Sequence, residues 1–511
     1  MRILTTEQMR AAERASLSHG LTFLRLMENA GTGAYRIIAG REGALFGKRC
    51  VVLCGVGNNG GDGFVVARRF ARDGAVVSCV LAGGEPRSDE AREMLRLLHG
   101  EPVSILRLEE SRPSVNLLLM EADLIIDAMF GTGFHGVLPD GCGFLAEMSG
   151  LAKARVYSLD IPSGMNADSG GIEGRCFNAD CTIAFGCLKP AHIEPSAAPM
   201  LGEVAVCDIG ISDDVYGAVG SKTHLIDGRM VRQLLRPRTD DSYKGTFGRL
   251  LVVAGSLGMT GAAVLCARAA SYSGAGLVYV AAPKQTVPIL AGHLIEQVML
   301  PMPENGEGVL GDEAAVPLAK AVKGKTACVA GCGLRNTAGT RMAVLSLLSN
   351  AECPIVLDAD GINALNGDID IVRQAAYGVV LTPHYGEFAR LVNKQTTFIE
   401  QNRAALAAEY AQAHGVTLVL KGAYTVVALP DGSVYLLNCP NSGLAKGGSG
   451  DLLAGLIGGL LAQGHTTKEA AVCGVYLHAR AAQLTAGRLC KTTMQPSDVL
   501  GDLHLVFREL A

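Results

Sequence analysis

Short apolar runs that end in Gly or Asp recur along the first half of the chain, with helix-like stretches between several of them. Alternating strand and helix signals are typical of a mostly parallel sheet with helices on both faces. The pattern therefore predicts a Rossmann-like, three-layer α/β/α domain. The expected strands cover residues 49–55, 75–83, 122–131, 154–160, 179–186 and 203–210, and expected helices include residues 88–98 and 115–121.

A polar, irregular stretch over residues 212–223 interrupts this series, and a second α/β series follows it. The pattern predicts a boundary near residue 222 and two domains, residues 1–222 and 223–511. A hairpin over residues 425–437 is expected to turn at Pro430-Asp-Gly432, and the final third is helix-rich. The expected strands of the second domain cover residues 249–255, 276–282, 327–331, 354–358, 378–382 and 416–421.

Length and charge narrow the class of protein. A chain of 511 residues is too long for one hydrophobic core. The net charge of −4, without a long run of like charge, argues against tight binding to nucleic acid or to an acidic membrane. The apolar run over residues 452–462 is too short to span a bilayer.

The termini and the cysteines indicate a cytoplasmic protein. Thr5-Thr-Glu-Gln8 predicts a capping box that opens a helix, where a signal peptide would have an apolar core. The 15 cysteines form no C-x-x-C pair, so zinc-site and redox spacings are absent and reduced thiols are expected.

A glycine-rich segment after the first expected strand raises the first question of function. The residues from Gly55 to Gly60 fit G-x-G-x-x-G, but Asn58-Asn-Gly-Gly-Asp-Gly63 departs from the usual dinucleotide fingerprint. Two amides and a carboxylate crowd the turn where a pyrophosphate would lie. Glycines still allow close approach of a ligand, and the N-terminus of a following helix still favours phosphate.

Two other expected strands end in polar motifs, Asp127-Ala-Met-Phe-Gly-Thr-Gly133 and Asp160-Ile-Pro-Ser-Gly164. In an open α/β sheet such strand ends converge on the ligand crevice. Asn59, Asp127 and Ser163 would then offer oxygen atoms to a cation. The simpler interpretation is that Asp127 and Ser163 only cap helices.

These three motifs together resemble the N-terminal domain of the NAD(P)H-hydrate repair enzymes over roughly residues 1–215. The resemblance implies an epimerase for the hydrated dinucleotides NADHX and NADPHX, which would be substrates and not cofactors. It implies K+ bound by Asn59, Asp127 and Ser163, and a catalytic carboxylate, Asp160, that contacts the nicotinamide end. Whether Asp160 acts as a base or steadies a cationic intermediate stays open. The implied substrate-binding residues are Asn58, Asn59, Gly60, Gly61, Asp62, Gly131, Thr132, Gly133, Phe134, His135, Gly136, Val137 and Asp160.

The strongest motif of the second half runs from Asn441 to Gly455 and includes Gly447-Gly-Ser-Gly-Asp451. A glycine cluster directly before an apolar helix presents free backbone N–H groups to an anion. Asp451 at the start of that helix can accept a proton from a hydroxyl that attacks a phosphoryl group. The simpler interpretation is a glycine-rich cap with an Asp favoured by the helix dipole.

Four further motifs accompany this one in the second half. They are Thr382-Pro-His-Tyr-Gly-Glu387, Lys421-Gly-Ala-Tyr-Thr425, Gly255-Ser-Leu-Gly-Met-Thr-Gly261 and Gly331-Cys-Gly-Leu334. Together they resemble the ribokinase-like dehydratase domain of the same repair enzymes, over roughly residues 224–508. The resemblance implies an ADP-dependent dehydratase of S-NAD(P)HX, with Mg2+ accompanying the nucleotide and Asp451 as catalytic base. The implied substrate contacts are Gly261, Gly333, His384 and Asp451, and the implied nucleotide contacts are Lys421, Gly422, Ala423, Tyr424, Thr425 and Gly450.

The chain departs from the family pattern at two positions. Lys446 stands where the family more often has Thr, and Cys332 stands in a common Gly-Pro-Gly. The expected protein is a homo-oligomer, a tetramer or larger, whose partners are NADHX, NADPHX and ADP. A kinase for a vitamin-like alcohol is the alternative enzyme, since ribokinase-like folds host many acceptors. A nucleotide-binding or scaffold protein with a degenerate first half is the alternative from another class.

Overall fold

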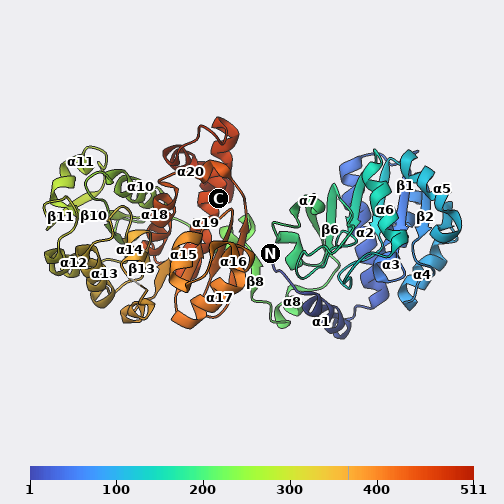
Figure 1. The fold of residues 1–511 in the computed structure, drawn as a ribbon, viewed down its shortest axis with the longest axis horizontal. Helices are drawn as coiled ribbons and strands as arrows, with labels where there is room; N and C mark the ends of the chain where they lie inside the picture. Colours follow the sequence, from blue (N-terminus) through green and yellow to red (C-terminus); the bar gives the residue numbers. More distant parts are fainter. Residues whose placement is uncertain (366) are drawn as a thin grey trace. The chain divides into compact units, whose positions relative to one another are not determined.

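The computed structural model describes residues 1–365 and 367–511, and the chain forms two compact units, Met1–Ser221 and Lys222–Ala511 (Figure 1). The sequence boundary assigns Lys222 to the first domain. Val434 N donates to Lys222 O at 2.7 Å and Lys222 Nζ donates to Asp431 O at 2.7 Å, so its contacts lie in the second unit.

The first unit is built on a seven-stranded sheet in the order β3-β2-β1-β4-β5-β6-β7. All its strand pairs are parallel. The predicted Rossmann-like class is therefore confirmed, and the strand order reverses between β1 and β4. The strands are β1 (Arg49–Cys54), β2 (Val76–Leu81), β3 (Val103–Arg107), β4 (Leu124–Ala128), β5 (Arg155–Leu159), β6 (Cys181–Phe185) and β7 (Glu203–Cys207).

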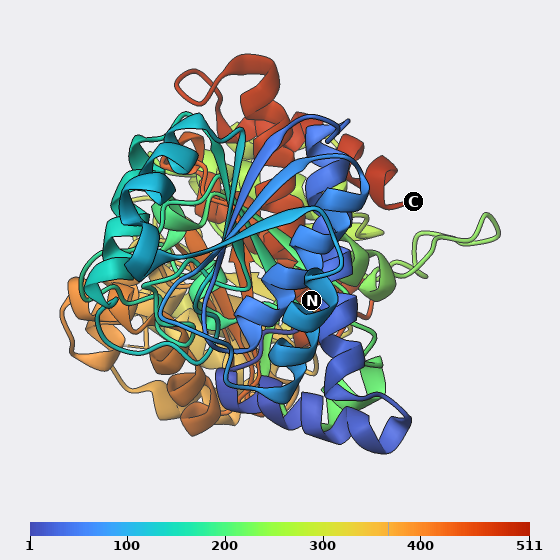
Figure 2. The ribbon, with the colours of Figure 1, turned by 90° about the vertical axis from the view of Figure 1, so that its right-hand side faces the viewer.

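Side chains alternate between two apolar layers on either face of this sheet. Cys50, Val52 and Cys54 pack with α2, α3 and α4, whereas Val51 and Leu53 pack with α5 and α6. Figure 2 shows the two groups of helices on opposite sides of the strands. The helices are α1 (Thr6–Ser16), α2 (Phe23–Glu42), α3 (Asn58–Arg72), α4 (Asp89–Leu98), α5 (Leu108–Glu121), α6 (Asp140–Leu151), α7 (Ala198–Leu201) and α8 (Asp213–Ala218).

The second unit has a ten-stranded sheet in the order β11-β10-β9-β12-β13-β14-β15-β16-β17-β8. Its strands are parallel except at the hairpin of β16 and β17, where the pairs of β16 with β15 and with β17 are antiparallel. Strand order reverses between β9 and β12. The strands are β8 (Thr223–Leu225), β9 (Arg249–Val253), β10 (Leu277–Pro283), β11 (Val298–Met302), β12 (Ala327–Ala330), β13 (Ile355–Leu357), β14 (Val379–Leu381), β15 (Thr417–Leu420), β16 (Tyr424–Ala428) and β17 (Val434–Asn438).

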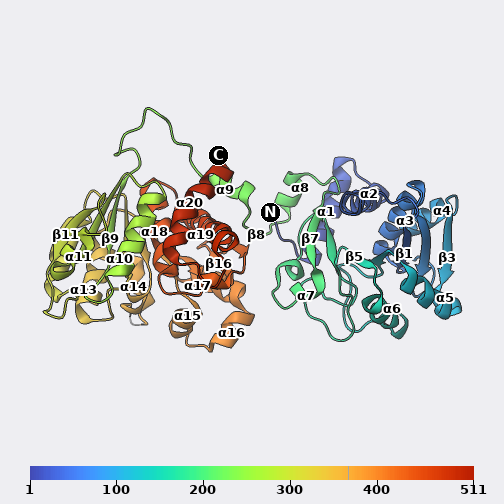
Figure 3. The ribbon, with the colours of Figure 1, turned by 90° about the horizontal axis from the view of Figure 1, so that it is seen from above.

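One large apolar core joins a face of this sheet to α10, α18, α19 and α20. Figure 3 shows α18, α19 and α20 side by side over it. The helices are α9 (Gly228–Leu234), α10 (Thr260–Tyr272), α11 (Val287–Ala291), α12 (Ala315–Ala321), α13 (Ala338–Asn350), α14 (Asp360–Asn363), α15 (Tyr385–Val392), α16 (Thr396–Gln401), α17 (Arg403–His414), α18 (Ser449–Ala462), α19 (Thr467–Leu489) and α20 (Pro496–Leu510). Within the described residues, no helix has the length and apolar character needed to cross a membrane.

The structure adds elements that the apolar pattern did not predict. β3 and β11 are edge strands with several exposed or half-exposed residues, and β11 contains Pro301. Neither strand therefore gives the continuous apolar run by which the other strands were predicted. α8 lies within the stretch expected to be irregular, β8 begins at the last residue of that stretch, and each element is short. α3 begins at Asn58, so the glycine-rich segment expected as a turn forms the first turns of a helix.

Candidate functional site

The first candidate site lies where the strand order of the first unit reverses. α3 begins at Asn58, directly after β1, with Gly57 as its N-cap. Gly61 N donates to Gly57 O, and the described residues provide no acceptor for the N–H groups of Asn58, Asn59 and Gly60. Free N–H groups and the helix dipole make this helix start suited to a phosphate.

Gly60 is required by the packing of this helix start. A Cβ on Gly60 would lie 2.0 Å from the carbonyl oxygen of Gly55, so any larger residue would push α3 away from β1. The same close approach buries Asn59 and Asp62, whereas Asn58 stays exposed.

The predicted loop from Gly131 to Val137 follows β4 at the same sheet edge. A Cβ on Gly131 would lie 3.1 Å from Asp160 Oδ2 and 3.5 Å from Asn59 Oδ1, so the loop start contacts both other motifs. Thr132 N donates to Asp160 Oδ2 at 3.1 Å. Gly133, His135 and Val137 are exposed and Gly136 is half-buried, whereas the Phe134 ring packs in the apolar layer beside α5 and α6.

Asp127 and Ser163 form a tight buried pair. Ser163 Oγ donates to Asp127 Oδ1 at 2.5 Å, and Ser163 N donates to Asp127 Oδ2 at 2.8 Å. Ser158 Oγ donates to Asp127 Oδ2 at 2.9 Å and Met129 N donates to Asp127 Oδ1 at 3.3 Å. Burial raises the pKa of Asp127 to about 6, although these hydrogen bonds oppose the rise.

Asn59 has the unpartnered oxygen of the predicted ligand set. Its Nδ2 donates to Leu159 O at 3.3 Å, whereas its buried Oδ1 has no hydrogen-bond partner in the described part of the chain. A buried amide oxygen without a donor is costly unless a cation or water satisfies it. The all-oxygen donor set of Asn59, Asp127 and Ser163 therefore fits a hard cation such as K+.

Asp160 is held by residues that the sequence analysis missed. Lys189 Nζ donates to Asp160 Oδ1 at 2.6 Å and to Phe185 O at 2.8 Å. Lys189 N donates to His192 Nδ1 at 2.9 Å, so His192 Nε2 carries the proton that it donates to Asp160 O at 2.7 Å. A Lys inside the apolar stretch after β6 was the available signal, because a buried Lys needs an anionic partner.

Burial and charge act in opposite directions on the carboxyl groups here. Burial alone would raise the pKa of Asp160, but the Lys189 ammonium outweighs it and holds that pKa below its ordinary value. Burial and then the charge of Asp160 raise the pKa of Asp62 well above its ordinary value. Burial also raises the pKa of Glu13 on α1, a further carboxyl group near Asp160 that the sequence analysis missed. Carboxyl groups with separated pKa values are typical of acid–base sites.

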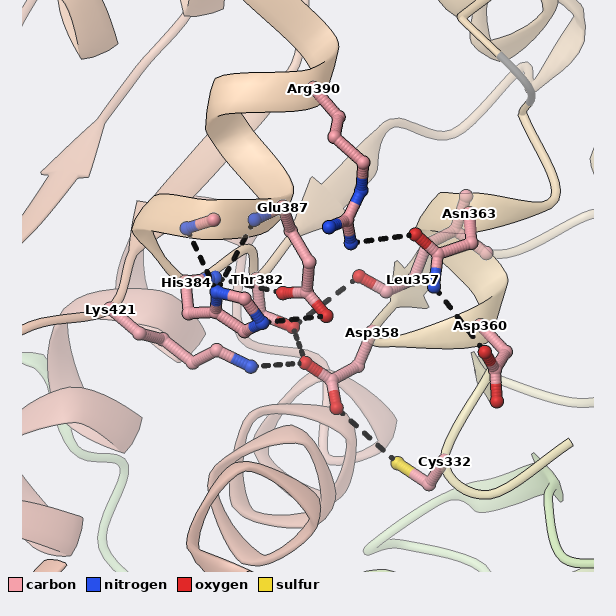
Figure 4. Close-up of polar contacts among 11 residues, drawn as sticks. Cys332, Leu357, Asp358, Asp360, Asn363, Thr382, His384, Glu387, Arg390 and Lys421 are labelled. Atoms are coloured by element: carbon pink, nitrogen blue, oxygen red, sulfur yellow. Dashed lines mark hydrogen bonds and ion pairs between the residues drawn. The ribbon is translucent and has the colours of Figure 1, made fainter. Parts of the chain in front are cut away.

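The second candidate site lies at the strand ends of the second unit, and Asp358 after β13 is its centre (Figure 4). Asp358 Oδ1 accepts from Lys421 Nζ at 2.7 Å and from Thr382 Oγ1 at 2.7 Å. Burial would lower the pKa of Lys421, but Asp358 and Glu387 outweigh that effect and raise it. Asp358 was not predicted from the sequence, although an Asp at a strand end is the signal by which Asp127 and Asp160 were predicted.

Asp451 lies in the first turn of α18, beside this ion pair. A Cβ on Gly450 would lie 3.1 Å from Lys421 Nζ and 3.8 Å from Asp358 Oδ2. Burial, followed by the charge of Asp358, raises the pKa of Asp451 to about 6. A carboxylate with a pKa near the working pH is suited to general base catalysis.

The start of α18 also has the donors that an anion needs. Within the described residues, the backbone N–H groups of Gly450 and Asp451 have no acceptor, and the buried Ser449 Oγ has no partner. The N-cap residue, Gly448, has φ 98°, which glycine adopts without strain. The predicted anion-binding turn therefore has backbone N–H groups available to a ligand.

The other predicted substrate contacts lie at neighbouring strand ends. Gly261 is in the first turn of α10, after β9, and a Cβ there would meet open space. Gly333 follows β12 with φ 64°. His384 is the N-cap of α15, and its Nδ1 accepts from Gly386 N at 2.9 Å and from Glu387 N at 3.2 Å. His384 thus has a structural role as a cap, while its exposed Nε2 remains beside Glu387.

The predicted nucleotide segment runs from Lys421 into β16. Its first residue, Lys421, pairs with Asp358. Gly422 packs closely on α15, because a Cβ there would lie 2.5 Å from the Tyr385 hydroxyl. Ala423 and Tyr424 follow, and Thr425 Oγ1 donates to Gly422 O at 3.0 Å, which stabilises the turn.

The two departures from the family pattern have different surroundings. Lys446 Nζ donates to Thr492 O at 2.8 Å and to Met494 O at 2.6 Å, so its charge fixes the segment before α20. Cys332 is buried at the site itself, and its Sγ lies 3.7 Å from Asp358 Oδ2. Gly331 permits this approach, because a Cβ there would lie 1.8 Å from Asp358 O.

The two units define a two-domain α/β enzyme, with a Rossmann-like domain followed by a second α/β domain whose helix α18 begins at a glycine-rich turn. Residues 24–191 match the family of the YjeF-related protein N-terminus, and residues 250–503 match the NAD(P)H-hydrate dehydratase family.

Relatives match over nearly the whole chain. A bifunctional NAD(P)H-hydrate repair enzyme of Moorella thermoacetica is 36% identical, covering 100% of this chain and 97% of its own. The enzyme of the same name from Escherichia coli is 31% identical over 95% of this chain and 90% of its own. A Bacillus subtilis ADP/ATP-dependent NAD(P)H-hydrate dehydratase, co-crystallised with ATP/Mg2+, is 31% identical, with a TM-score of 0.49 over 56% of this chain and 99% of that chain.

The chain belongs to the family of bifunctional NAD(P)H-hydrate repair enzymes. The resemblance drawn from the motifs is thereby confirmed for both halves. The kinase alternative and the scaffold alternative are less supported, because the match extends over both domains.

Proposed function

We propose that this protein repairs hydrated nicotinamide dinucleotides in two steps, one in each unit. The first unit epimerises R- and S-NAD(P)HX, and the second dehydrates the S form to NAD(P)H while ADP becomes AMP and phosphate. The observation that carries the proposal is that both families match in one chain and each unit has a polar site at the ends of its parallel strands.

In the first unit, the free N–H groups at the start of α3 are suited to the pyrophosphate of the substrate. The loop from Gly131 to Val137 would cover the nicotinamide end. Asp160, kept ionised by Lys189, would manage the protons that inversion at C6 requires. Asn59, Asp127 and Ser163 would hold K+, whose charge would offset the buried carboxylates.

In the second unit, the C6 hydroxyl would attack the β-phosphoryl group of ADP, and Asp451 would accept its proton. The β-phosphoryl group moves to the C6 oxygen, and AMP leaves. The C6–O bond then breaks, phosphate departs with the bonding electrons, and a proton lost from C5 restores the ring double bond. The N–H groups of Gly450 and Asp451 would stabilise the transferring group.

The nucleotide would lie along the segment from Lys421 to Thr425 and against Gly450. Mg2+ bound to its phosphates would neutralise their charge, and the carboxylates of Asp358 and Asp451 are donors of the type that Mg2+ prefers. We further propose a cytoplasmic homo-oligomer, a tetramer or larger, without nucleic-acid or membrane partners.

The test is a coupled assay on purified epimers. S-NADHX with ADP should give the near-ultraviolet absorbance of NADH, and R-NADHX should do so after epimerisation. The same assay with ATP measures nucleotide choice. A protein that phosphorylates a vitamin-like alcohol but leaves both epimers unchanged would be a kinase, and this proposal would be wrong.

A further inference from the structure

A thiol lies between two carboxylates at the anion-binding end of the second unit. One ligand atom from each of Cys332, Asp358 and Asp451 lies within 4.8 Å of the other two. The Cys332 and Asp358 side chains are buried, and Asp451, on α18, is the most accessible of the three. Three elements far apart in the sequence thus bring one sulfur and two oxygen ligands together.

The spacing suits a small divalent cation. Around a tetrahedral zinc ion, a sulfur and an oxygen ligand lie about 3.5 Å apart, given bonds of about 2.3 Å and 2.0 Å. Cys332 Sγ and Asp358 Oδ2 lie 3.7 Å apart. Three protein ligands with an open fourth position are typical of zinc sites that also bind water or substrate.

Neighbouring side chains orient the central ligand. Lys421 Nζ and Thr382 Oγ1 both donate to Asp358 Oδ1, so Asp358 Oδ2 faces Cys332 (Figure 4). Outer hydrogen bonds of this kind fix ligand direction and contribute to metal affinity.

We propose that Cys332 Sγ, Asp358 Oδ2 and the Asp451 carboxylate bind a thiophilic divalent cation, Zn2+ or Cd2+, and that the bound ion blocks dehydration. A thiolate ligand selects such ions over Mg2+, which takes oxygen ligands. The inhibition rests on the proposed function of this unit, because the ion would occupy the base Asp451. The binding itself does not depend on that function.

The charges of the site balance when the ion is bound. Coordination displaces the thiol proton of Cys332, which passes to solvent, and gives three anionic ligands. Their charge is offset by the divalent ion together with Lys421, which stays on the opposite oxygen of Asp358. Cys266 is buried and its side chain interacts with that of Cys332, but it is not part of the ligand set.

The test measures Cd2+ binding to the full-length protein without substrate or nucleotide. Cys490→Ser is the starting protein, because Cys490 is exposed and would bind Cd2+ adventitiously. It should bind one Cd2+ equivalent with the ultraviolet charge-transfer band of a cadmium thiolate. Adding Cys332→Ser should abolish that band and weaken binding by at least about 100-fold. An unchanged band in the Cys332→Ser protein would overturn the proposal.

A second measurement covers the case in which Cys332→Ser fails to fold. Anomalous scattering from a zinc-soaked crystal of the Cys490→Ser protein should place the ion within bonding distance of Cys332 Sγ, Asp358 and Asp451. No ion there, or an ion only at surface residues, would overturn the site.

In the assay, Cd2+ should slow dehydration by at least about 10-fold and a chelator should restore it. An ion at the site without inhibition would overturn the inhibitory role alone. A protein that is inactive with Mg2+ and ADP when Zn2+ and Cd2+ are absent would contradict the proposed function instead.

Discussion

Lys189 Nζ lies 2.6 Å from Asp160 Oδ1, and the two side chains are only 1% and 10% exposed. Asp160 also has φ 63°, a left-handed conformation that costs a non-glycine residue free energy. His192 holds its carbonyl oxygen and Thr132 holds its second carboxylate oxygen. A strained backbone and a paired charge thus fix this carboxylate at the predicted epimerase site.

Replacing Lys189 with Met should shift the pH dependence of epimerisation. Without the ammonium, burial dominates and the pKa of Asp160 rises, so the carboxylate is lost at higher pH than in the parent. We expect the acid limb of the epimerase rate to move to higher pH and the rate near neutral pH to fall by at least about 10-fold. The measurement is conversion of pure R-NADHX across pH.

Lys189→Arg is the matched control for this change, because it retains the charge beside Asp160. Its acid limb should lie close to that of the parent. Dehydration of S-NADHX should persist in both variants, which checks that the second unit is folded. An acid limb of Lys189→Met that coincides with the parent's would exclude Lys189 from the setting of that pKa.

Asn59→Ala should weaken activation by K+. Within the described residues, Asn59 Oδ1 is the one oxygen of the predicted ligand set that has no protein donor, and the variant removes it. Asp127 and Ser163 keep their mutual hydrogen bonds. Epimerase activity should need at least about 10-fold more K+ for half-activation. The check is a K+ titration at constant ionic strength. A K+ titration identical to that of the parent would remove Asn59 from the ligand set.

The residues at the strand ends of the first site could be predicted from the sequence. Asn59, Asp127 and Asp160 each follow an apolar run, and that local pattern is visible without knowledge of the fold. The roles of Lys189 and His192 could not be predicted in this way, because they depend on β6 lying beside β5 in the sheet. Such neighbours are decided by the packing of the whole sheet.

The second site, too, could be predicted from the sequence only in part. Asp451 and the glycine cluster were predicted, because they form one continuous segment at a helix start. The pairing of Asp358 with Lys421 spans 63 residues, and only the order β13-β14-β15 brings the two strand ends together. The capping role of His384 was also missed, since it depends on the N–H groups of Gly386 and Glu387 turning toward its ring.

Asp451→Asn should abolish most dehydration while epimerisation continues. The amide retains the size of the side chain but cannot accept the hydroxyl proton, so we expect a loss of at least about 10²-fold. The measurement is NADH formation from S-NADHX and ADP at saturating nucleotide. Asp360→Asn, which changes a carboxylate at the start of α14, is the matched control. Near-parental dehydration by Asp451→Asn would contradict its assignment as the base.

Dehydration by the unaltered protein should fall as the solution becomes more acidic than about pH 6. Burial and the charge of Asp358 raise the pKa of Asp451 to about 6, and a base acts only when deprotonated. The rate constant kcat/KM for S-NADHX should therefore decline tenfold per pH unit below that value. An acid limb close to the ordinary range of an exposed Asp would show that another group controls the reaction.

The two units should act independently when separated after Ser221. Each has its own sheet and its own apolar core, and Lys222 has its contacts in the second unit. A fragment of residues 222–511 retains all of β8, so it should fold and convert S-NADHX to NADH with ADP. On a mixture of epimers it should consume the S form quickly and then slow to the rate of spontaneous epimerisation. Adding residues 1–221 as a separate chain should restore fast, complete conversion, because the intermediate diffuses between sites. Fast and complete conversion by residues 222–511 alone would mean that the second unit accepts both epimers, and the Asn58–Gly63 segment would then need another substrate.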